Sequence, residues 1–265
     1  MSVYSEGDGE ATFVFMSGGG TCSPILDFKS LYTLLSDQYK VVVVERFGYG
    51  FSDTAHRERD IVSILEDTRA ALKEADIDPP FILCPHSMAG IEALYWAQQY
   101  PHEVRAIIGL DMATPAAYEK MEISKSMLRC FQFAARTGMT RLIPGLSDGT
   151  AVKYGTLTEQ EKEIYRSIFY SRTMTEPMVK EMFSVKDNAK QVAEGGDIAT
   201  PILLFCSNGS GTGFTETEWR EGQISFAQQA AAGIGNGEII YLDCGHYIHN
   251  FEFEKIAHEI KSWLK

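Results

Sequence analysis

Six short apolar runs, most of them without hydrophobic–polar alternation, constrain the fold of this chain more than any other feature of its sequence. They lie at 11–16, 40–45, 81–84, 104–110, 201–206 and 238–243. Such runs are typical of strands that are buried on both faces of a parallel sheet. Segments with apolar residues on one helical face lie between them, at 26–39, 60–75 and 90–100. This order predicts an α/β fold with a mostly parallel central sheet, flanked by helices and joined by right-handed crossovers.

The strand pattern stops after Leu110 and resumes at Pro201. The residues between about 113 and 196 favour helices instead. The helical segments expected there are 116–137, 158–172 and 176–194. An all-helical insertion between two late strands cannot extend the sheet, so we expect it to lie over one edge or end of the sheet. The predicted organisation is a core of residues 1–112 and 197–265 with a helical cap of residues 113–196.

Composition limits the partners that this chain can bind. Of its 265 residues, 24 are Lys or Arg and 36 are Asp or Glu, which gives a formal charge of −12. An acidic surface repels nucleic acid and anionic membranes, so we expect neither as a main partner, although a local basic patch is compatible with this charge. No run of about 18 apolar residues occurs in the sequence, so we expect no membrane span.

The cysteines and the amino terminus indicate the compartment. The five cysteines lie far apart and form no CxxC pair. Their odd number and the lack of metal-ligand spacing favour reduced thiols. The first residues, MSVYSEGDGE, are acidic and polar, unlike a secretory signal. We therefore expect a soluble cytoplasmic protein.

A lone serine, Ser87, stands where a strand pattern changes directly into a helix pattern. The apolar residues 81–84 lead into Pro-His-Ser-Met-Ala-Gly, and helical spacing begins immediately afterwards. A sharp strand-to-helix turn would hold this serine at the carboxyl end of the sheet. Such a turn needs small residues on either side, and Ala89 satisfies this on one side. Capping the helix is the ordinary role of such a serine, so motifs elsewhere must decide between a cap and a nucleophile.

Four motifs, in this order along the chain, resemble those of the α/β-hydrolase fold family. FMSGGGTCSP (15–24) resembles its glycine-rich oxyanion loop, with Ser17 where the family often has histidine. ERFGYGFSD (45–53) resembles the turn after the following strand. PHSMA (85–89) resembles the nucleophile elbow G-x-S-x-G, with proline in place of the first glycine. LDCGHYIHN (242–250) resembles the loop that carries the catalytic histidine.

This resemblance implies a serine hydrolase in which Ser87 is the nucleophile and His246 is the base that removes its proton. The family places the base after the last strand, where His246 follows a glycine. We interpret His86 and His249 as structural residues that pack or cap. The remaining histidines are expected at the surface: His56, His102 and His258.

The acid that orients the histidine has more than one candidate. The family usually draws it from the loop after the penultimate strand, but here that loop (207–214) has no carboxylate before Glu216. Some branches draw it from the end of the strand after the elbow helix, where Asp111 stands. We favour Asp111, for which a turn cap is the alternative role. Glu216 is the reserve and Asp243 a weaker third, whereas Asn208 could orient a histidine but could not offset its charge.

Two backbone N–H groups are expected to stabilise an oxyanion. One belongs to Met88, next to the serine, and the other to the glycines at 18–20, with Gly19 preferred. Three glycines directly after a buried strand suit a close approach of the backbone to a ligand. The sequence shows no metal-ligand constellation, no phosphate loop and no dinucleotide fingerprint. We therefore expect chemistry on a small-molecule substrate without a cofactor or a metal.

Several functions remain compatible with the resemblance. The leading hypothesis is cleavage of an ester-like bond in a small or medium apolar substrate through an acyl-enzyme. The family also contains proline-releasing aminopeptidases, carbon–carbon hydrolases and lactonases with the same constellation. The alternative of another class is a ligand receptor that retains the triad.

Side chains of the expected cap bear on these alternatives. Its Met and Phe residues suit either the core of the cap or an apolar acyl pocket: Met121, Met127, Phe131, Phe133, Met139, Phe169, Met174, Met178, Met182 and Phe183. Its glutamates could recognise an amine, although a solvated helix face is their commoner role: Glu119, Glu122, Glu161, Glu163, Glu176 and Glu181.

The family usually begins with two further antiparallel strands. Here only about ten residues precede the first clear strand. We therefore expect a truncated sheet, shorter by one or two strands, in which SVYSEGDGE (2–10) is the remnant of the second. The resulting edge would be exposed or used in an oligomer of unknown size.

Overall fold

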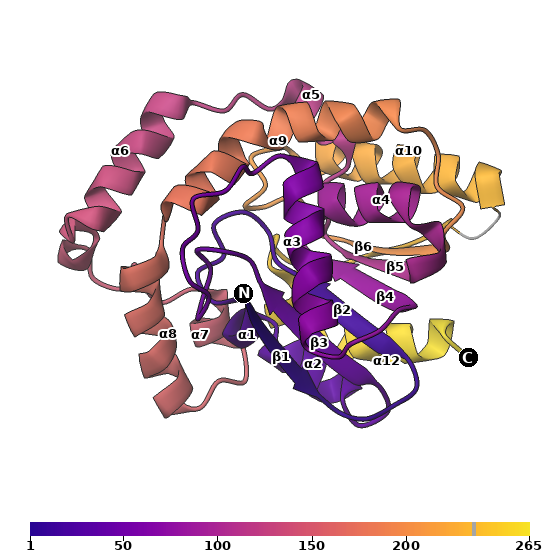
Figure 1. Ribbon diagram of the computed structural model, residues 1–265, viewed down its shortest axis with the longest axis horizontal. Helices are drawn as coiled ribbons and strands as arrows, with labels where there is room; N and C mark the ends of the chain where they lie inside the picture. Colours follow the sequence, from indigo (N-terminus) through magenta and orange to yellow (C-terminus); the bar gives the residue numbers. More distant parts are fainter. Residues whose placement is uncertain (235–236) are drawn as a thin grey trace.

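A computed structural model describes residues 1–234 and 237–265 of the chain. Within them, seven strands form one sheet in the order β1-β3-β2-β4-β5-β6-β7 (Figure 1). The strands are β1 (Ser2–Glu6), β2 (Thr12–Met16), β3 (Lys40–Glu45), β4 (Phe81–Pro85), β5 (Val104–Leu110), β6 (Ile202–Cys206) and β7 (Gly237–Tyr241). Only the pairing of β1 with β3 is antiparallel among these strands. The predicted mostly parallel α/β sheet is confirmed.

Burial explains why the apolar runs lack alternation. Every residue of β2, β4 and β6 is buried, so both faces of these strands select apolar side chains. In β3, Val42 and Val44 belong to the hydrophobic cluster on one face of the sheet. Val41 and Val43 belong to the cluster on the other face. The sheet therefore has a core on each side.

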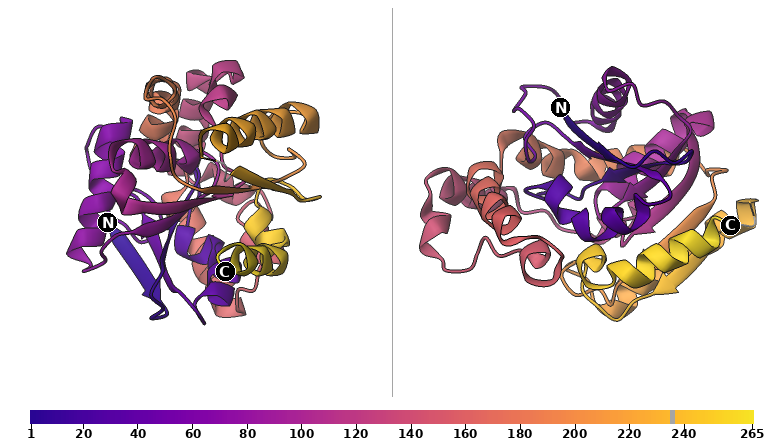
Figure 2. Two further views of the ribbon diagram at one scale, coloured as in Figure 1. Left: turned by 90° about the vertical axis from the view of Figure 1, so that its right-hand side faces the viewer. Right: turned by 90° about the horizontal axis from the view of Figure 1, so that it is seen from below.

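Helices cover both faces of the sheet (Figures 1 and 2). One face carries α3 (Ile61–Glu74), α4 (Ala89–Gln99) and α10 (Glu216–Ile234). The other carries α1 (Pro24–Asp27), α2 (Lys29–Leu35), α11 (Ile248–Phe251) and α12 (Phe253–Trp263). A short 3-10 helix, η1 (Pro101–Glu103), leads from α4 into β5.

Helices also fill the chain between β5 and β6. They are α5 (Pro115–Lys120), α6 (Lys125–Arg136), η2 (Met139–Leu142), α7 (Thr150–Tyr154), α8 (Glu159–Arg172) and α9 (Glu176–Glu194). Both α5 and α6 pack against α9, which also contacts α4 of the core. In Figure 1, α6 and α8 extend away from the sheet. We propose that residues 113–196 act together as the cap.

The predicted helix at 116–137 is wrong in one respect, because the structure divides it into α5 and α6. Met121 has an extended backbone at the end of α5. Ser124 then caps α6, since its hydroxyl accepts a hydrogen bond from the N–H of Met127 at 3.3 Å. A good N-cap residue inside a helical pattern starts a new helix there.

The segment at the amino terminus forms a strand at the edge of the sheet. β1 pairs with β3 in a register that aligns Ser2 with Glu45 and Glu6 with Val41. The N–H of Ser2 also donates to the hydroxyl of Ser52 at 2.7 Å. A strand therefore forms within the segment at 2–10.

Candidate active site

Ser87 lies in the tight turn between β4 and α4. Its backbone φ is +53°, in the left-handed region that non-glycine residues rarely adopt. Two N–H groups hold the turn, because the Ser87 carbonyl accepts from Gly90 at 2.9 Å and from Ala113 at 2.8 Å. The N-cap of α4 is Met88 rather than Ser87. The hydroxyl of Ser87 instead lies 2.8 Å from Nε2 of His246.

Close backbone approach around the turn depends on two glycines. A Cβ on Gly18 would lie 2.7 Å from Cβ of Ser87, and a Cβ on Gly90 would lie 2.3 Å from the carbonyl oxygen of Ala113. The sequence pattern assigns the small neighbour to Ala89. The tighter contact is one residue further on, at Gly90, where α4 crosses the chain that leaves β5.

His246 lies on the loop that follows β7. Its backbone N–H donates to the carbonyl of Ser210 at 2.9 Å, which fixes the loop. The two ring nitrogens face different partners: Nε2 faces Ser87, and Nδ1 lies 2.6 Å from Oδ2 of Asp111. The carboxylate can only accept, so the Nδ1–H donates to Asp111 and leaves Nε2 as the acceptor for the serine hydroxyl.

Asp111 is fully buried directly after β5, and its φ is +48°. Three donors surround its carboxylate. Oδ1 accepts from the N–H of Ser207 at 2.7 Å and from the indole N–H of Trp219 at 2.8 Å, while Oδ2 accepts from His246. These hydrogen bonds compensate the burial of the negative charge.

The other acid candidates lie elsewhere. Glu216 stands in the first turn of α10 with a side chain that is 53% exposed, and it pairs with Arg220 at 2.6 Å. Asp243 accepts from the amide of Asn208 at 3.3 Å at the surface. The structure therefore brings Asp111, rather than Glu216 or Asp243, to His246. No sequence motif indicates Trp219, which reaches Asp111 from α10.

Two further histidines pack behind His246. The Nε2–H of His86 donates to the backbone carbonyl of His246 at 3.1 Å, and the two rings lie 4.6 Å apart. Burial lowers the pKa of His86 well below its usual value, and the neighbouring His246 and His249 lower it further. His249 is also buried, and its Nε2–H donates to Asp27 at 2.8 Å. These contacts support the loop of His246. The histidines expected at the surface are exposed: His56, His102 and His258.

A cavity of about 200 Å³ opens onto Ser87. Gly18 and Gly19 line it on the side of the sheet, and Tyr118 and Met121 line it from the segment between β5 and β6. Among the hydrogen bonds of the described residues, neither the N–H of Gly19 nor that of Met88 has an acceptor. Both N–H groups are therefore without a protein acceptor in the described part of the chain.

Few of the cap methionines and phenylalanines reach this cavity. Met121 lines it, and a Cβ on Gly20 would lie 3.1 Å from Cε of Met182. Met178 is fully buried in the interior. Others point outward and are more than half exposed: Met127, Phe131, Phe133 and Met139.

The cap glutamates have different environments. Glu161 pairs with Lys29, and Glu176 pairs with Arg129 at 2.9 Å. The interpretation of Glu181 as part of a solvated face is wrong, because its side chain is 1% exposed. Arg46 and Arg59 offset its charge.

Residues 1–234 and 237–265 show neither a metal centre nor a membrane-spanning helix. In that part of the chain, no group of three His, Cys, Asp or Glu side chains has an arrangement that could hold a metal ion. No helix there is long and apolar enough to cross a bilayer.

Comparison with known proteins places the chain in a family. The sequence profile described as alpha/beta hydrolase fold matches residues 11–252. The uncharacterized protein YbdG of Bacillus subtilis (strain 168) is 40% identical over 210 residues, which is 77% of this chain and 65% of that relative. The chain thus spans just under two thirds of the length of that relative.

Solved structures share the fold at low sequence identity. The enol-lactonase from Burkholderia xenovorans LB400 has a TM-score of 0.71 and 18% identity, over 99% of this chain and 95% of that one. A structure reported in a study of carboxylesterases from Nitrososphaera gargenis has a TM-score of 0.65 and 15% identity, over 99% and 93% of the two chains. These likenesses concern the fold alone.

Proposed function

The chain belongs to the α/β-hydrolase fold family, and from that premise we propose that it is a serine hydrolase that cleaves an ester-like bond through an acyl-enzyme. One observation carries this proposal. The hydroxyl of Ser87 lies 2.8 Å from Nε2 of His246, whose Nδ1 lies 2.6 Å from the buried carboxylate of Asp111. A serine hydroxyl is a weak nucleophile unless an oriented base removes its proton.

The proposed reaction uses these groups in sequence. Ser87 Oγ attacks the ester carbonyl while Nε2 of His246 takes the hydroxyl proton, and Asp111 stabilises the imidazolium that forms. The N–H groups of Gly19 and Met88 bind the resulting oxyanion. His246 then gives its proton to the leaving alcohol, which departs and leaves the acyl group on Ser87. A water molecule, deprotonated by His246, hydrolyses this acyl-enzyme.

The size of the cavity supports a small or medium substrate. Its volume is about 200 Å³, and the side chains of Tyr118, Met121 and Trp219 contribute to its wall. Binding pockets for drug-sized ligands run from roughly 300 to 1,000 Å³, so a short acyl chain fits better than a long one. Esters such as p-nitrophenyl acetate and butyrate are therefore suitable first substrates.

The test is ester hydrolysis by the wild-type chain and by Ser87→Ala and His246→Ala. We expect multiple turnovers in the wild type and a loss of kcat of at least about 10⁴-fold in each variant. Ser126→Ala and His258→Ala are matched controls at exposed positions, and they should retain wild-type rates. A fluorophosphonate probe should label Ser87, as mass spectrometry of the modified peptide would report, and His246→Ala should abolish the labelling.

The same experiment separates an enzyme from a receptor. Stabilisation of the protein by an ester or lactone without multiple turnover would support a receptor that retains the triad. Labelling at another serine, or full activity in Ser87→Ala, would overturn the proposed mechanism.

A further inference from the structure

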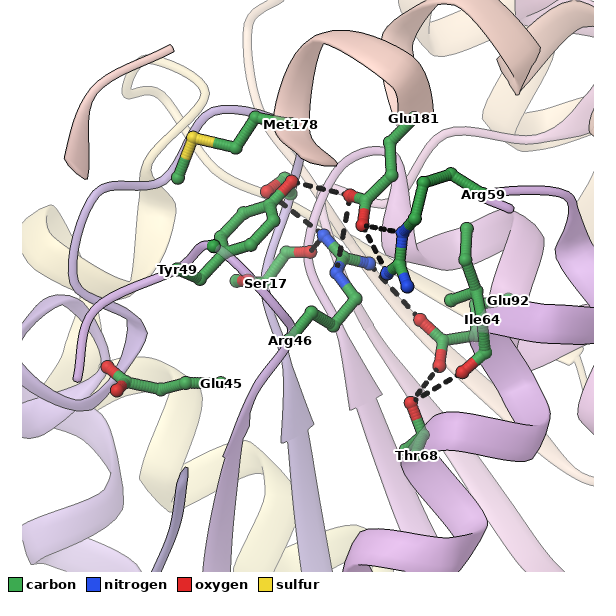
Figure 3. A network of polar contacts seen from close by, with 12 residues as sticks. Ser17, Glu45, Arg46, Tyr49, Arg59, Ile64, Thr68, Glu92, Met178 and Glu181 are labelled. Atoms are coloured by element: carbon green, nitrogen blue, oxygen red, sulfur yellow. Dashed lines mark hydrogen bonds and ion pairs between the residues drawn. The ribbon is translucent and has the colours of Figure 1, made fainter. Parts of the chain in front are cut away.

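A buried charge network contacts the start of the glycine loop (residues 17–20) at Ser17 (Figure 3). Its members come from distant parts of the chain and are each at most 6% exposed: Arg46, Arg59, Asp67, Glu92 and Glu181. Arg57, at the surface, pairs with the second oxygen of Asp67 at 3.0 Å. Three arginines thus face three carboxylates, and the mutual compensation of charge allows the burial of the network.

Arg46 is the member that touches the glycine loop. Its Nη2 donates to the carbonyl of Ser17 at 2.8 Å and to that of Gly18 at 3.4 Å. Its Nη1 donates to Oε2 of Glu92 at 3.1 Å. One planar guanidinium therefore joins the loop after β2 to helix α4, in the fixed fork geometry that arginine provides and lysine does not.

We propose that Arg46 is a positioning residue that sets the spacing between the two halves of the oxyanion hole. This inference rests on the proposed function. Gly19, which supplies one N–H, directly follows the two carbonyls that Arg46 binds. Met88, which supplies the other, immediately precedes α4, one turn before Glu92. Arg46 is not among the residues that line the cavity at Ser87, so its proposed effect passes through the backbone of these two segments.

The cap contributes to the same buried charge network through α9. Glu181 accepts from the hydroxyl of Tyr49 at 2.6 Å and from Nε of Arg59 at 3.0 Å, and it lies 3.5 Å from Nε of Arg46. The next residue, Met182, places its methyl carbon 3.8 Å and 3.1 Å from the positions that a Cβ would take on Gly19 and Gly20. Adjacent residues of α9 therefore reach the glycine loop by two routes, one electrostatic and one by packing. A shift of α9 would change both.

The decisive variant is Arg46→Lys. It keeps the positive charge, but a single ammonium group cannot bind Ser17, Gly18 and Glu92 in the geometry of the guanidinium. We expect kcat for p-nitrophenyl butyrate to fall about 10- to 100-fold, because misplaced N–H donors stabilise the oxyanion less well. KM should change less than about twofold, since the ground-state ester does not use these donors fully. Glu181→Gln should lower kcat by a smaller factor, roughly three- to tenfold.

A transition-state mimic provides a readout that a merely structural role would not change. A trifluoromethyl ketone adds to Ser87 and forms a tetrahedral oxyanion, so its affinity depends on the oxyanion hole. In Arg46→Lys its affinity should fall by the same factor as kcat. The melting temperature verifies that each variant is folded, and Glu181→Gln keeps the proposal testable should Arg46→Lys fold poorly.

Arg69→Lys is the matched control. Arg69 also binds a carboxylate through its guanidinium, with Nη2 at 2.5 Å from Glu103. Glu103 immediately precedes β5, so this pair lies at the amino ends of the strands, whereas Ser87 lies at their carboxyl ends. The control should retain wild-type kcat, KM and inhibitor affinity.

Amide hydrogen exchange at residues 18–20 separates the failure of this inference from the failure of the proposed function. We expect faster exchange in Arg46→Lys and Glu181→Gln than in the wild type and Arg69→Lys. If neither the wild type nor any variant hydrolysed an ester, but the amides of residues 18–20 still exchanged faster in Arg46→Lys, the positioning role of Arg46 would be supported. The proposed function would then be wrong. Unchanged amide exchange together with unchanged kcat in Arg46→Lys would overturn the positioning role of Arg46, whatever the effect of Ser87→Ala.

Discussion

Ser87 and Asp111 share an unusual backbone conformation, with φ of +53° and +48°. Non-glycine residues in this region cost about 1–3 kcal/mol each. Hydrogen bonds hold both: the Ser87 carbonyl accepts from Gly90 and Ala113, and the Asp111 N–H donates to Phe205 at 2.8 Å. Left-handed backbone therefore occurs at the two residues whose side chains meet on one imidazole, and among the described residues also at Asp76 and Met174.

The assignment of the acid leads to the first prediction. Asp111→Asn should lower kcat by about 10⁴-fold, because an amide in place of the carboxylate favours the wrong tautomer of His246 and offers no charge to the imidazolium. Glu216→Gln should keep kcat within about twofold, since Glu216 binds Arg220 at the surface. Steady-state kinetics on a p-nitrophenyl ester would check both. A large loss confined to Glu216→Gln would reverse the assignment.

Glu45 carries a prediction on pH and stability. Its carboxylate is fully buried at the end of β3, where it accepts from the N–H groups of Phe51 at 2.6 Å and Ile25 at 3.3 Å. Burial raises the pKa of Glu45 to about 7, although these N–H donors and Arg172 act in the opposite direction. In the unfolded chain the same group has its ordinary pKa near 4.5.

The sign of the effect follows from proton binding. Between pH 4.5 and 7 the folded state holds more protons on Glu45 than the unfolded state does, so the free energy of unfolding falls as the pH rises through this window. From pH 5 to 8 the loss attributable to Glu45 is on the order of 2 kcal/mol. Urea unfolding at several pH values should show this loss in the wild type and its absence in Glu45→Gln. Parallel curves for the two proteins would refute it.

Sequence patterns identify some site residues and not others for a physical reason. Ser87 and His246 stand in local motifs, because the elbow and the histidine loop impose turn chemistry on their neighbours. The prediction of Asp111 as the acid depends on the lack of a carboxylate in the loop at 207–214. Arg46 and Trp219 act through partners far away in the sequence, such as Glu181 and Asp111, and no local pattern specifies such a contact.

At the scale of elements, the approach of α4 to the end of β5 determines where Ser87 stands. Gly90 lies at this crossing, and a Cβ there would meet the carbonyl oxygen of Ala113 at 2.3 Å and Cβ of Met112 at 3.0 Å. The obstacle at the closer position is backbone, which cannot move aside as a flexible side chain can. The crossing therefore depends on the absence of a side chain.

The second element-scale feature is the boundary between α5 and α6. Apolar spacing across 116–137 favours a helix throughout, whereas the backbone turns at Met121 and a new helix begins after Ser124. Helical periodicity continues in phase across such a break, so it does not reveal the change in direction. The strands are easier to predict, because β2, β4 and β6 are buried on both faces and must be apolar throughout.

The crossing at Gly90 gives the third prediction. Gly90→Ala should lower the free energy of unfolding by about 1–3 kcal/mol, because the added methyl group overpacks the crossing. It should also lower kcat, since α4 can only retreat by moving the turn of Ser87. Gly222→Ala is the control: Gly222 lies in α10 with no atom within 4 Å of the added Cβ. That substitution should be neutral or stabilise by up to about 1 kcal/mol. Denaturant unfolding and ester kinetics would measure both effects, and equal stability of the two variants would contradict this account.

At the scale of the whole molecule, the parts of the site come from both sides of the cap segment. Ser87 and Asp111 precede it, and His246 follows it. The parallel sheet brings them together because the carboxyl ends of β4, β5 and β7 lie along the same edge. The order of strand and helix patterns was sufficient to predict this common edge. The placement of α9 over the glycine loop was not predictable, because it depends on the buried contacts of Glu181.

The net charge of the molecule gives the fourth prediction. A chain with 36 acidic and 24 basic residues carries −12, and its long-range field repels anionic substrates and attracts cationic ones. Salt screens this field: the Debye length falls from about 30 Å at 0.01 M to about 10 Å at 0.1 M ionic strength. The test uses matched p-nitrophenyl-type esters that carry a sulfonate, no charge or a quaternary ammonium group. Added salt should change kcat/KM in opposite directions for the anionic and the cationic ester.

We expect kcat/KM for the anionic ester to rise roughly three- to tenfold over this range, that for the cationic ester to fall by a similar factor, and that for the neutral ester to stay constant. The neutral ester is the control for effects of salt on folding or on the chemical step. An anionic ester whose kcat/KM is insensitive to salt would contradict this prediction, because the net charge would then not govern the approach of the substrate. Differences in kcat/KM among the three esters would then come from their contacts in the cavity, because the long-range field would have no effect on the rate.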